Sequence, residues 1–247
     1  MPTRRRFLAA VATTPALAAE AAPTLFELRR YRMRPGRRDT LLAMFESVFQ
    51  DAYEAGGTRI VGSFRDLDDA DRWVWIRAFP DAVQRGPALA NFYGSAAWVA
   101  GREAANATIA DVAPALLLRS HQEGLPPADA APAPVFVITV HPLAPQHAAA
   151  FPAFFDATVA PTLSALGVAP FASFVSDTRP NAFPRQPVHE GPVFVSVQRF
   201  ASRAACDAFI EARQAAWRGK VQAALARRLA GPLETMRLQP APRSRWR

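Results

Sequence analysis

Residues 25–49, LFELRRYRMRPGRRDTLLAMFESVF, return in altered form 110 positions later as residues 135–159, VFVITVHPLAPQHAAAFPAFFDATV. Apolar residues keep their places, so that Phe26 falls on Phe136. The agreement continues in chain order with Gly57 on Gly167 and, at an offset of 121, with Trp73 on Phe194, Val74 on Val195 and Phe79 on Phe200. Similarity at a fixed spacing is the signature of a repeated unit, so the chain is predicted to hold two copies of one fold.

Each copy is predicted to follow the order β-α-β-β-α-β, because stretches with strand and helix periodicity alternate in that order. In the first copy strands are expected at 25–33, 58–66, 72–79 and 114–120, with helices at 41–53 and 81–106. In the second copy strands are expected at 135–141, 168–176, 193–200 and 233–238, with helices at 146–166 and 203–229. Residues 178–192 are too rich in proline to be regular and form an insertion in the second hairpin.

Helices on one face of a four-stranded antiparallel sheet leave the other face bare, and two copies can cover their bare faces against each other. The predicted fold class is therefore α+β, with two tandem ferredoxin-like repeats packing sheet to sheet as a pseudo-dimeric α/β barrel around an enclosed lumen. The predicted boundaries are 23–121 for the first domain, 122–134 for a Pro/Ala linker, 135–240 for the second domain and 241–247 for a solvated basic tail.

Residues 1–22 resemble a twin-arginine export signal. The basic cluster RRRFL at 4–8 precedes a mildly apolar stretch, and ALA at 16–18 supplies the small residues that a signal peptidase prefers. We therefore expect an exported, periplasmic protein, with a cytoplasmic protein bearing a basic extension as the alternative. No later segment is apolar enough to serve as a stable membrane anchor.

Charge and rare residues exclude several function classes. The net charge is +8, but arginines are scattered among acidic residues and no nucleic-acid-binding motif is present, so no nucleic acid partner is expected. The single cysteine, Cys206, excludes an intramolecular disulfide and a cysteine-rich zinc module. Four dispersed histidines predict no metal site, and no nucleophile elbow, phosphate-binding glycine loop or HExxH motif occurs.

Strand alternation predicts which side chains share a face. Phe26 and Leu28 are expected to face the helices, which turns the residues between them toward the lumen. The lumen candidates are Arg29, Tyr31, Trp75, Arg77 and His141, a set that combines aromatic walls with a few polar groups, as small-molecule pockets do. The alternative is structural: Arg29 pairs with Glu27 or another carboxylate, and the aromatic residues fill the core.

The stretches FELRRYRMRPGRRDTLLAMFE (26–46), GSFRDLDDADRWVWIRAF (62–79) and W-x-x-x-R-E-A-A-N-A-T-I-A-D from Trp98 resemble bacterial NIPSNAP-type proteins. In the second copy the best match is FPRQPVHEGPVFV (183–195). The resemblance implies the dimeric α/β-barrel fold, whose superfamily includes cofactor-free monooxygenases, haem enzymes and ligand-binding proteins. The molecular activity of the bacterial NIPSNAP branch itself is poorly defined.

Three functions remain open at this point. The first is a protein that binds a small, partly apolar ligand in the lumen. The second is a cofactor-independent or haem-linked oxidoreductase, in which His141, Tyr31 or Arg29 would position an aromatic substrate or its oxyanion. His141 is the candidate axial ligand if haem is bound, although the residues themselves predict no cofactor. The third is an interaction protein whose barrel is filled. Further self-association to a homo-oligomer is compatible with each of them.

Overall fold

The computed structural model describes residues 22–122 and 135–247. The predicted export signal and linker therefore lie outside the described residues, apart from residues 22 and 122, and stay predictions. Within the described ranges, no helix combines the length and apolar character needed to cross a membrane.

The first repeat contains the predicted β-α-β-β-α-β order with one extra short strand. Its elements are β1 (Leu25–Met33), α1 (Arg38–Met44), η1 (Phe45–Phe49), α2 (Gln50–Ala55), β2 (Arg59–Asp66), β3 (Arg72–Phe79), α3 (Ala82–Gly94), α4 (Ala96–Thr108), β4 (Ile109–Val112) and β5 (Leu116–Ser120). Side chains of Asp81 and Ser95 cap α3 and α4 by accepting hydrogen bonds from backbone N–H groups. Gly57 follows the first helix with a φ of 96°, a conformation that favours glycine.

The second repeat follows the same plan. Its elements are β6 (Val135–Pro142), η2 (Pro145–His147), α5 (Phe151–Phe154), η3 (Phe155–Val159), α6 (Ala160–Ala165), β7 (Ala172–Ser176), β8 (Val193–Phe200), α7 (Arg203–Trp217), α8 (Lys220–Ala226) and β9 (Glu234–Pro240). The π-helical turns η1 and η3 start at Phe45 and Phe155, which are 155 − 45 = 110 positions apart. A rare local distortion at the same offset supports the duplication predicted from the sequence.

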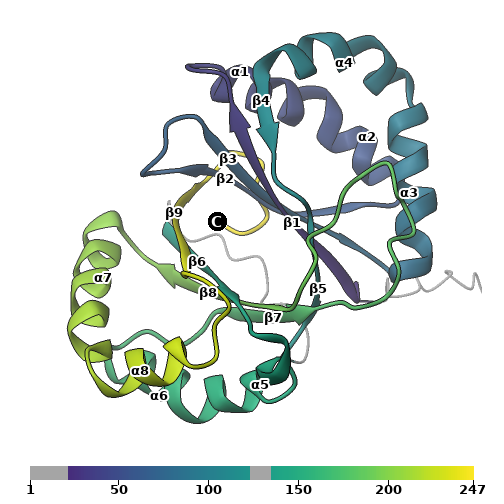
Figure 1. Ribbon diagram of the computed structural model, residues 1–247. Coiled ribbons are helices and arrows are strands. Elements are labelled where there is room, and N and C mark those ends of the chain that lie inside the picture. The colour runs from purple at the N-terminus through teal and green to yellow at the C-terminus, as the bar shows by residue number, and fades with distance from the viewer. Residues whose placement is uncertain (1–21, 123–134) are drawn as a thin grey trace, which may run out of the picture.

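Eight antiparallel strands close into a barrel in the order β3-β2-β9-β6-β8-β7-β5-β1, with β1 pairing back to β3. The two repeats join where β2 pairs with β9 and where β5 pairs with β7. The short β4 pairs with the end of β1 outside this ring. In Figure 1 the helices of each repeat cover the outside of its own strands, and the predicted pseudo-dimeric α/β barrel is confirmed.

The barrel interior is filled with apolar side chains rather than open. Phe26, Leu28, Val74, Ile76 and Phe136 belong to one buried cluster drawn from both repeats. An eight-stranded barrel has an interior just wide enough for its own side chains. The predicted lumen pocket is therefore wrong: Phe26 and Leu28 point into the barrel, and the residues that alternate with them point toward the helices.

The C-terminal segment is part of this core and not a solvated tail. Trp246 is 2% exposed and its ring lies 5.1 Å from that of Phe171 and 6.0 Å from that of Phe136. Backbone hydrogen bonds tie the segment to β2, with Trp246 N donating to Val61 O at 3.0 Å. The arginines that alternate with the buried residues made this segment look like a solvated tail in the sequence. Two of them, Arg243 and Arg245, form ion pairs with Asp51 and Glu54 of α2.

Replacing Trp246 with alanine should lower the free energy of unfolding by about 3–5 kcal/mol, because it leaves a cavity in the barrel interior. Urea denaturation measures the change. The control, Arg245→Ala, removes a surface ion pair and should cost about 0–1 kcal/mol. Equal costs for the two variants would contradict the placement of the tail in the core.

Candidate functional site

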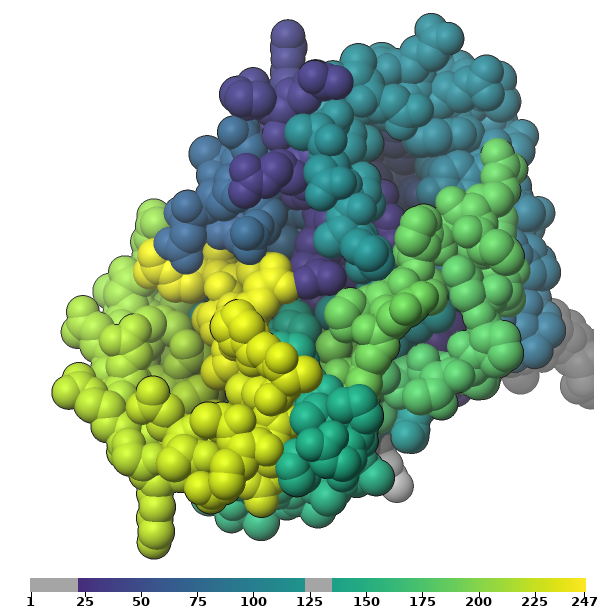
Figure 2. Space-filling view, viewed as in Figure 1, coloured from purple at the N-terminus to yellow at the C-terminus, as the bar shows by residue number. Residues whose placement is uncertain are grey.

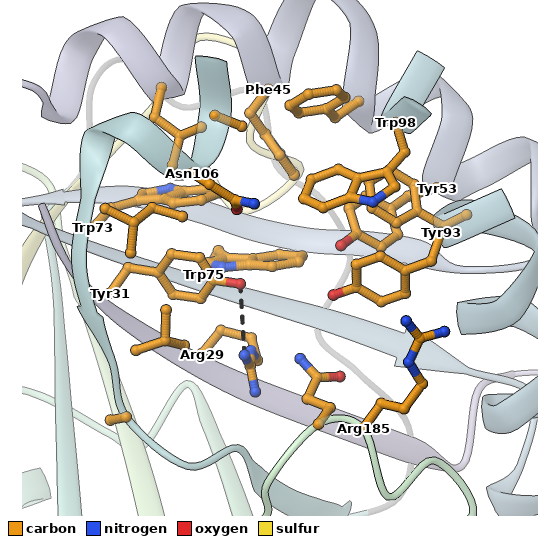
Figure 3. Close-up of a pocket in the computed structure, with 18 of the residues that line it drawn as sticks. Arg29, Tyr31, Phe45, Tyr53, Trp73, Trp75, Tyr93, Trp98, Asn106 and Arg185 are labelled. Atoms are coloured by element: carbon orange, nitrogen blue, oxygen red, sulfur yellow. Dashed lines mark hydrogen bonds between the residues drawn. The ribbon is translucent and has the colours of Figure 1, made fainter. Parts of the chain in front are cut away.

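A pocket of about 390 Å³ lies between the sheet and the helices of the first repeat (Figure 3). Strands β1 and β3 form its floor, and helices α1 to α4 form its walls. The residues that line it are Arg29, Tyr31, Leu41, Phe45, Phe49, Tyr53, Trp73, Trp75, Phe92, Tyr93, Trp98, Ala105, Asn106, Ile109, Val112, Ala113, Pro114, Phe183, Arg185, Gln186 and Pro187. None of these lining residues is Asp, Glu, His, Lys, Cys or Met.

Stacked aromatic rings give the pocket flat walls. Trp73 and Trp75, two apart on β3, stack with their ring planes 4° apart. Tyr53 and Phe92 stack with centroids 3.5 Å apart. Trp98 of α4 lies on the same side as Tyr53 (Figure 3) and packs against Phe92 with centroids 5.4 Å apart. Such surfaces suit a planar molecule, because aromatic rings prefer stacked or edge-to-face contact.

Two side chains of the pocket have buried N–H groups without a hydrogen-bond partner in the described part of the chain. Arg29 is 3% exposed; its Nη2 donates a long hydrogen bond of 3.5 Å to the hydroxyl of Tyr31, and within residues 22–122 and 135–247 its Nε and Nη1 make none. The buried indole Nε1 of Trp75 likewise has no acceptor among these residues. Buried polar groups are ordinarily hydrogen-bonded, so these N–H groups remain unsatisfied beside the cavity.

A loop from the second repeat roofs the pocket of the first. Residues 177–192, between β7 and β8, cross to the first repeat and pair with it at Ala115 and Val188. The ring of Phe183 stacks on Tyr93 with centroids 5.7 Å apart. In the space-filling view a recess lies between this green loop and the teal chain of β4 (Figure 2). The insertion that looked irregular in sequence thus completes a site that neither repeat would form alone.

A buried ion network anchors that loop beside the pocket. Glu27, with no exposed surface, accepts a hydrogen bond from Arg77 Nε at 2.6 Å and another from Arg85 Nε. Arg77 Nη2 also donates to Gln186 Oε1 at 2.5 Å, and Arg85 Nη1 donates to Asn181 Oδ1 at 2.7 Å. Both arginines therefore connect the sheet carboxylate to the loop.

The network keeps Glu27 ionised. Burial alone would raise the pKa of Glu27, but the charges of Arg77, Arg85 and Arg29 outweigh it and hold the pKa below its usual value. Burial would likewise lower the pKa of Arg77, and the adjacent Glu27 carboxylate raises it instead. The ion pairs of Glu27 with Arg77 and Arg85 are therefore structural. The structural alternative in the sequence analysis expected such a pair for Arg29 instead.

Of the five predicted site residues, the structure brings three together. Arg29, Tyr31 and Trp75 line the pocket, although from the helix side of the sheet and not from the lumen. Arg77 lies behind them in the ion network, with its guanidinium 5.1 Å from the ring of Trp75. His141 lies in the second repeat, away from this pocket. The sequence analysis assigned this face to the lumen, which is wrong. Both faces of β1 and β3 are buried. Strand alternation shows which residues share a face, but not whether that face turns into the barrel or toward the helices.

Sequence reasoning missed Tyr93 and the loop residues Phe183, Arg185 and Gln186. Their place depends on a contact between repeats that no local pattern reports. For Trp98 and Asn106 a signal existed, since they share one helix face, but that face was read as a packing seam. Arg185 is exposed and lies across the pocket from the helices that carry Trp98 (Figure 3).

His141 is enclosed by aromatic rings of the second repeat. It is 1% exposed, and the rings of Phe151, Phe155 and Phe194 lie 5.6, 6.1 and 5.8 Å from its imidazole. Its Nδ1 lies 3.1 Å from the carbonyl oxygen of Phe194. Burial lowers the pKa of His141 to about 4, so the ring is neutral at neutral pH.

No family model and no curated protein matches the chain, whereas solved structures match nearly all of it. An anthrone oxidase-like protein is 16% identical, with a TM-score of 0.59 over 89% of this chain and 92% of that one. A provisionally named monooxygenase from Fusobacterium nucleatum is 12% identical, with a TM-score of 0.56 over 90% and 94% of the two chains. At these identities the likeness establishes the fold, a pseudo-dimeric α/β barrel formed by one chain.

Solved NIPSNAP proteins are also among the structural matches. One from Agrobacterium tumefaciens, of unknown function, is 17% identical and covers 43% of this chain and 97% of that one. Its TM-score is 0.38.

The two buried arginines of β1 and β3 should respond differently to removal. Arg77→Met should lower the free energy of unfolding by about 3–5 kcal/mol, because it takes from Glu27 a buried charge partner. Arg29→Met should leave it unchanged or raise it, because the lost guanidinium is desolvated without a carboxylate partner. Urea denaturation at neutral pH compares them, and a similar large loss in both would contradict the assignment of Arg29 as unpaired.

His141 should make stability depend on pH. Since its pKa of about 4 in the folded protein lies below the ordinary histidine value of 6.5, its contribution to stability is present above pH 6.5 and is lost as pH falls toward 4. The loss is about 3 kcal/mol at 1.36 kcal/mol per pKa unit. His141→Gln keeps a donor but does not titrate, so its unfolding free energy should fall less over this range. Parallel curves for the two proteins would show that His141 does not titrate in this way.

Proposed function

We propose that the protein binds a small, flat and mostly apolar molecule in the helix-side pocket of its first repeat. The observation that carries the proposal is an aromatic cavity of about 390 Å³ containing buried, unpartnered N–H groups of Arg29 and Trp75. Ligand pockets have volumes of roughly 300–1,000 Å³ and combine apolar walls with a few convergent polar groups. The barrel interior is filled, as expected for the interaction-protein alternative, but the first repeat holds a separate cavity in which Arg29, Tyr31 and Trp75 meet.

A cofactor-independent oxidoreductase is the alternative. Structural neighbours named as a monooxygenase and as an anthrone oxidase-like protein favour it, since they share the fold over most of both chains. An enzyme of this kind would need the same pocket to hold its substrate. Binding is therefore the common requirement, and fold alone does not choose between the two functions.

A haem-linked enzyme fits the described residues poorly, although a neighbour is named as a chlorite dismutase. The pocket lining offers no imidazole, thiolate or thioether to ligate iron. Its phenols remain, but burial raises the pKa of Tyr53 and Tyr93 and so disfavours the phenolate form that ligation requires. The buried His141 is packed among three phenylalanine rings in the other repeat.

The neutral fluorophore N-phenyl-1-naphthylamine tests the pocket, since its emission rises when an apolar site binds it. We expect one molecule to bind the wild-type protein. Ala113→Trp, which places a large ring in the pocket from the β4–β5 connection, should weaken binding by about tenfold or more, equivalent to 1.4 kcal/mol.

The matched control is Ala226→Trp, which fills a separate cleft beside α7 and α8 in the second repeat. It should leave the binding of the fluorophore unchanged. If the control abolishes binding and Ala113→Trp does not, the site lies in the second repeat and the proposal is wrong.

A further inference from the structure

The charges around the pocket do not balance. Three guanidinium groups, those of Arg29, Arg77 and Arg85, are buried on this side of the sheet, and each is at most 3% exposed. Glu27 is the carboxylate among them, and its two oxygens are taken by Arg77 and Arg85. Arg29 has no salt bridge within the described residues. Its guanidinium makes a long hydrogen bond to the Tyr31 hydroxyl, lies 5.4 Å from the centroid of the Tyr31 ring, and interacts with the Glu27 charge from beyond ion-pair distance.

A buried arginine without a counter-ion is costly, because its charge loses hydration and gains no partner. Arg29 nevertheless sits on β1 at the floor of the cavity, with Nε and Nη1 unpaired (Figure 3). An acidic group of a ligand would supply the missing negative charge, and guanidinium binds such groups through charge-assisted hydrogen bonds. The exposed Arg185 at the roof adds a second positive charge at the same cavity.

The pocket also lacks a group that would take a proton from a neutral ligand. Its ionisable lining residues are two arginines and the phenols Tyr31, Tyr53 and Tyr93. A general base must be unprotonated near the working pH, and the carboxylates, imidazoles and amines that usually serve do not occur in this lining. A ligand that pairs with Arg29 is therefore expected to enter the pocket already ionised.

Resting on the proposed function, we propose that the ligand is a planar aromatic anion, such as an aromatic carboxylate or an ionised phenol. Its acidic group binds the guanidinium of Arg29 on the floor. Its rings pack against the stacked pairs Trp73–Trp75 and Tyr53–Phe92. The aromatic walls set the shape of the ligand, and Arg29 sets its charge.

Two fluorophores with the same rings separate shape from charge. N-phenyl-1-naphthylamine is neutral, whereas 8-anilinonaphthalene-1-sulfonate carries in addition one sulfonate. We expect the wild-type protein to bind the sulfonate about tenfold or more tightly than the neutral probe. Arg29→Met should remove this preference, because the sulfonate loses far more affinity than the neutral probe, and Arg29→Lys should keep part of it because it keeps the charge.

The charge control is Arg227→Gln, which removes an exposed arginine at the end of α8 in the second repeat. It should leave both affinities unchanged. A loss of the sulfonate preference in this control as large as in Arg29→Met would overturn the proposal, since the effect would then come from net charge.

The remaining outcomes also decide the question. If the wild-type protein binds both probes equally, or if Arg29→Met keeps the preference, the anion proposal is overturned while the pocket proposal stands. If the wild-type protein binds neither probe, the proposed function itself fails. If Arg29→Met loses both probes, Arg29→Lys decides: retained preference supports the charge requirement, and loss of both probes there too overturns it.

Discussion

Closure of two four-stranded sheets into one barrel is the constraint on which the other features depend. Eight strands enclose a space that their own side chains fill, so Phe26, Leu28 and their counterparts in the second repeat form a dry interior. Strands β1, β3, β6 and β8 are buried along most of both faces. The polar residues Glu27, Arg29 and Arg77 of β1 and β3 lie under the helices, where each must find a partner, remain unpaired at a cost, or meet a ligand.

The two repeats keep one architecture but differ in how the space between sheet and helices is filled. The positions of Arg29 and Tyr31 in the first repeat correspond, at the offset of 110, to Thr139 and His141 in the second. The second repeat fills the corresponding region with phenylalanine rings around His141. It contributes instead the 177–192 loop, whose Phe183 and Gln186 line the pocket of the first repeat. Covalent linkage of the repeats makes this unequal division possible, because each copy is present once.

The buried arginines show how similar residues take different roles. Arg77 and Arg85 share Glu27 and hold the loop in place, so their charges are compensated within the protein. Arg29, two residues from Glu27 on the same face of β1, interacts with that carboxylate only from beyond ion-pair distance and forms no ion pair within the described residues. A site that stores an uncompensated charge among aromatic rings is prepared for an anion, since low polarity around the pair strengthens its attraction.

The sequence by itself determined the repeated unit, the order of its strands and helices and the closure of the sheets, because these follow from periodic apolar patterns and from an internal offset that the π-helical turns Phe45–Phe49 and Phe155–Val159 confirm. It also placed Arg29, Tyr31 and Trp75 on one face. Only the tertiary structure decided that this face lies under the helices, that Trp246 enters the barrel and that the loop at 177–192 covers the other repeat's pocket. Strand alternation is the same for a face turned inward or outward, and contacts between residues far apart in the chain leave no trace in local periodicity.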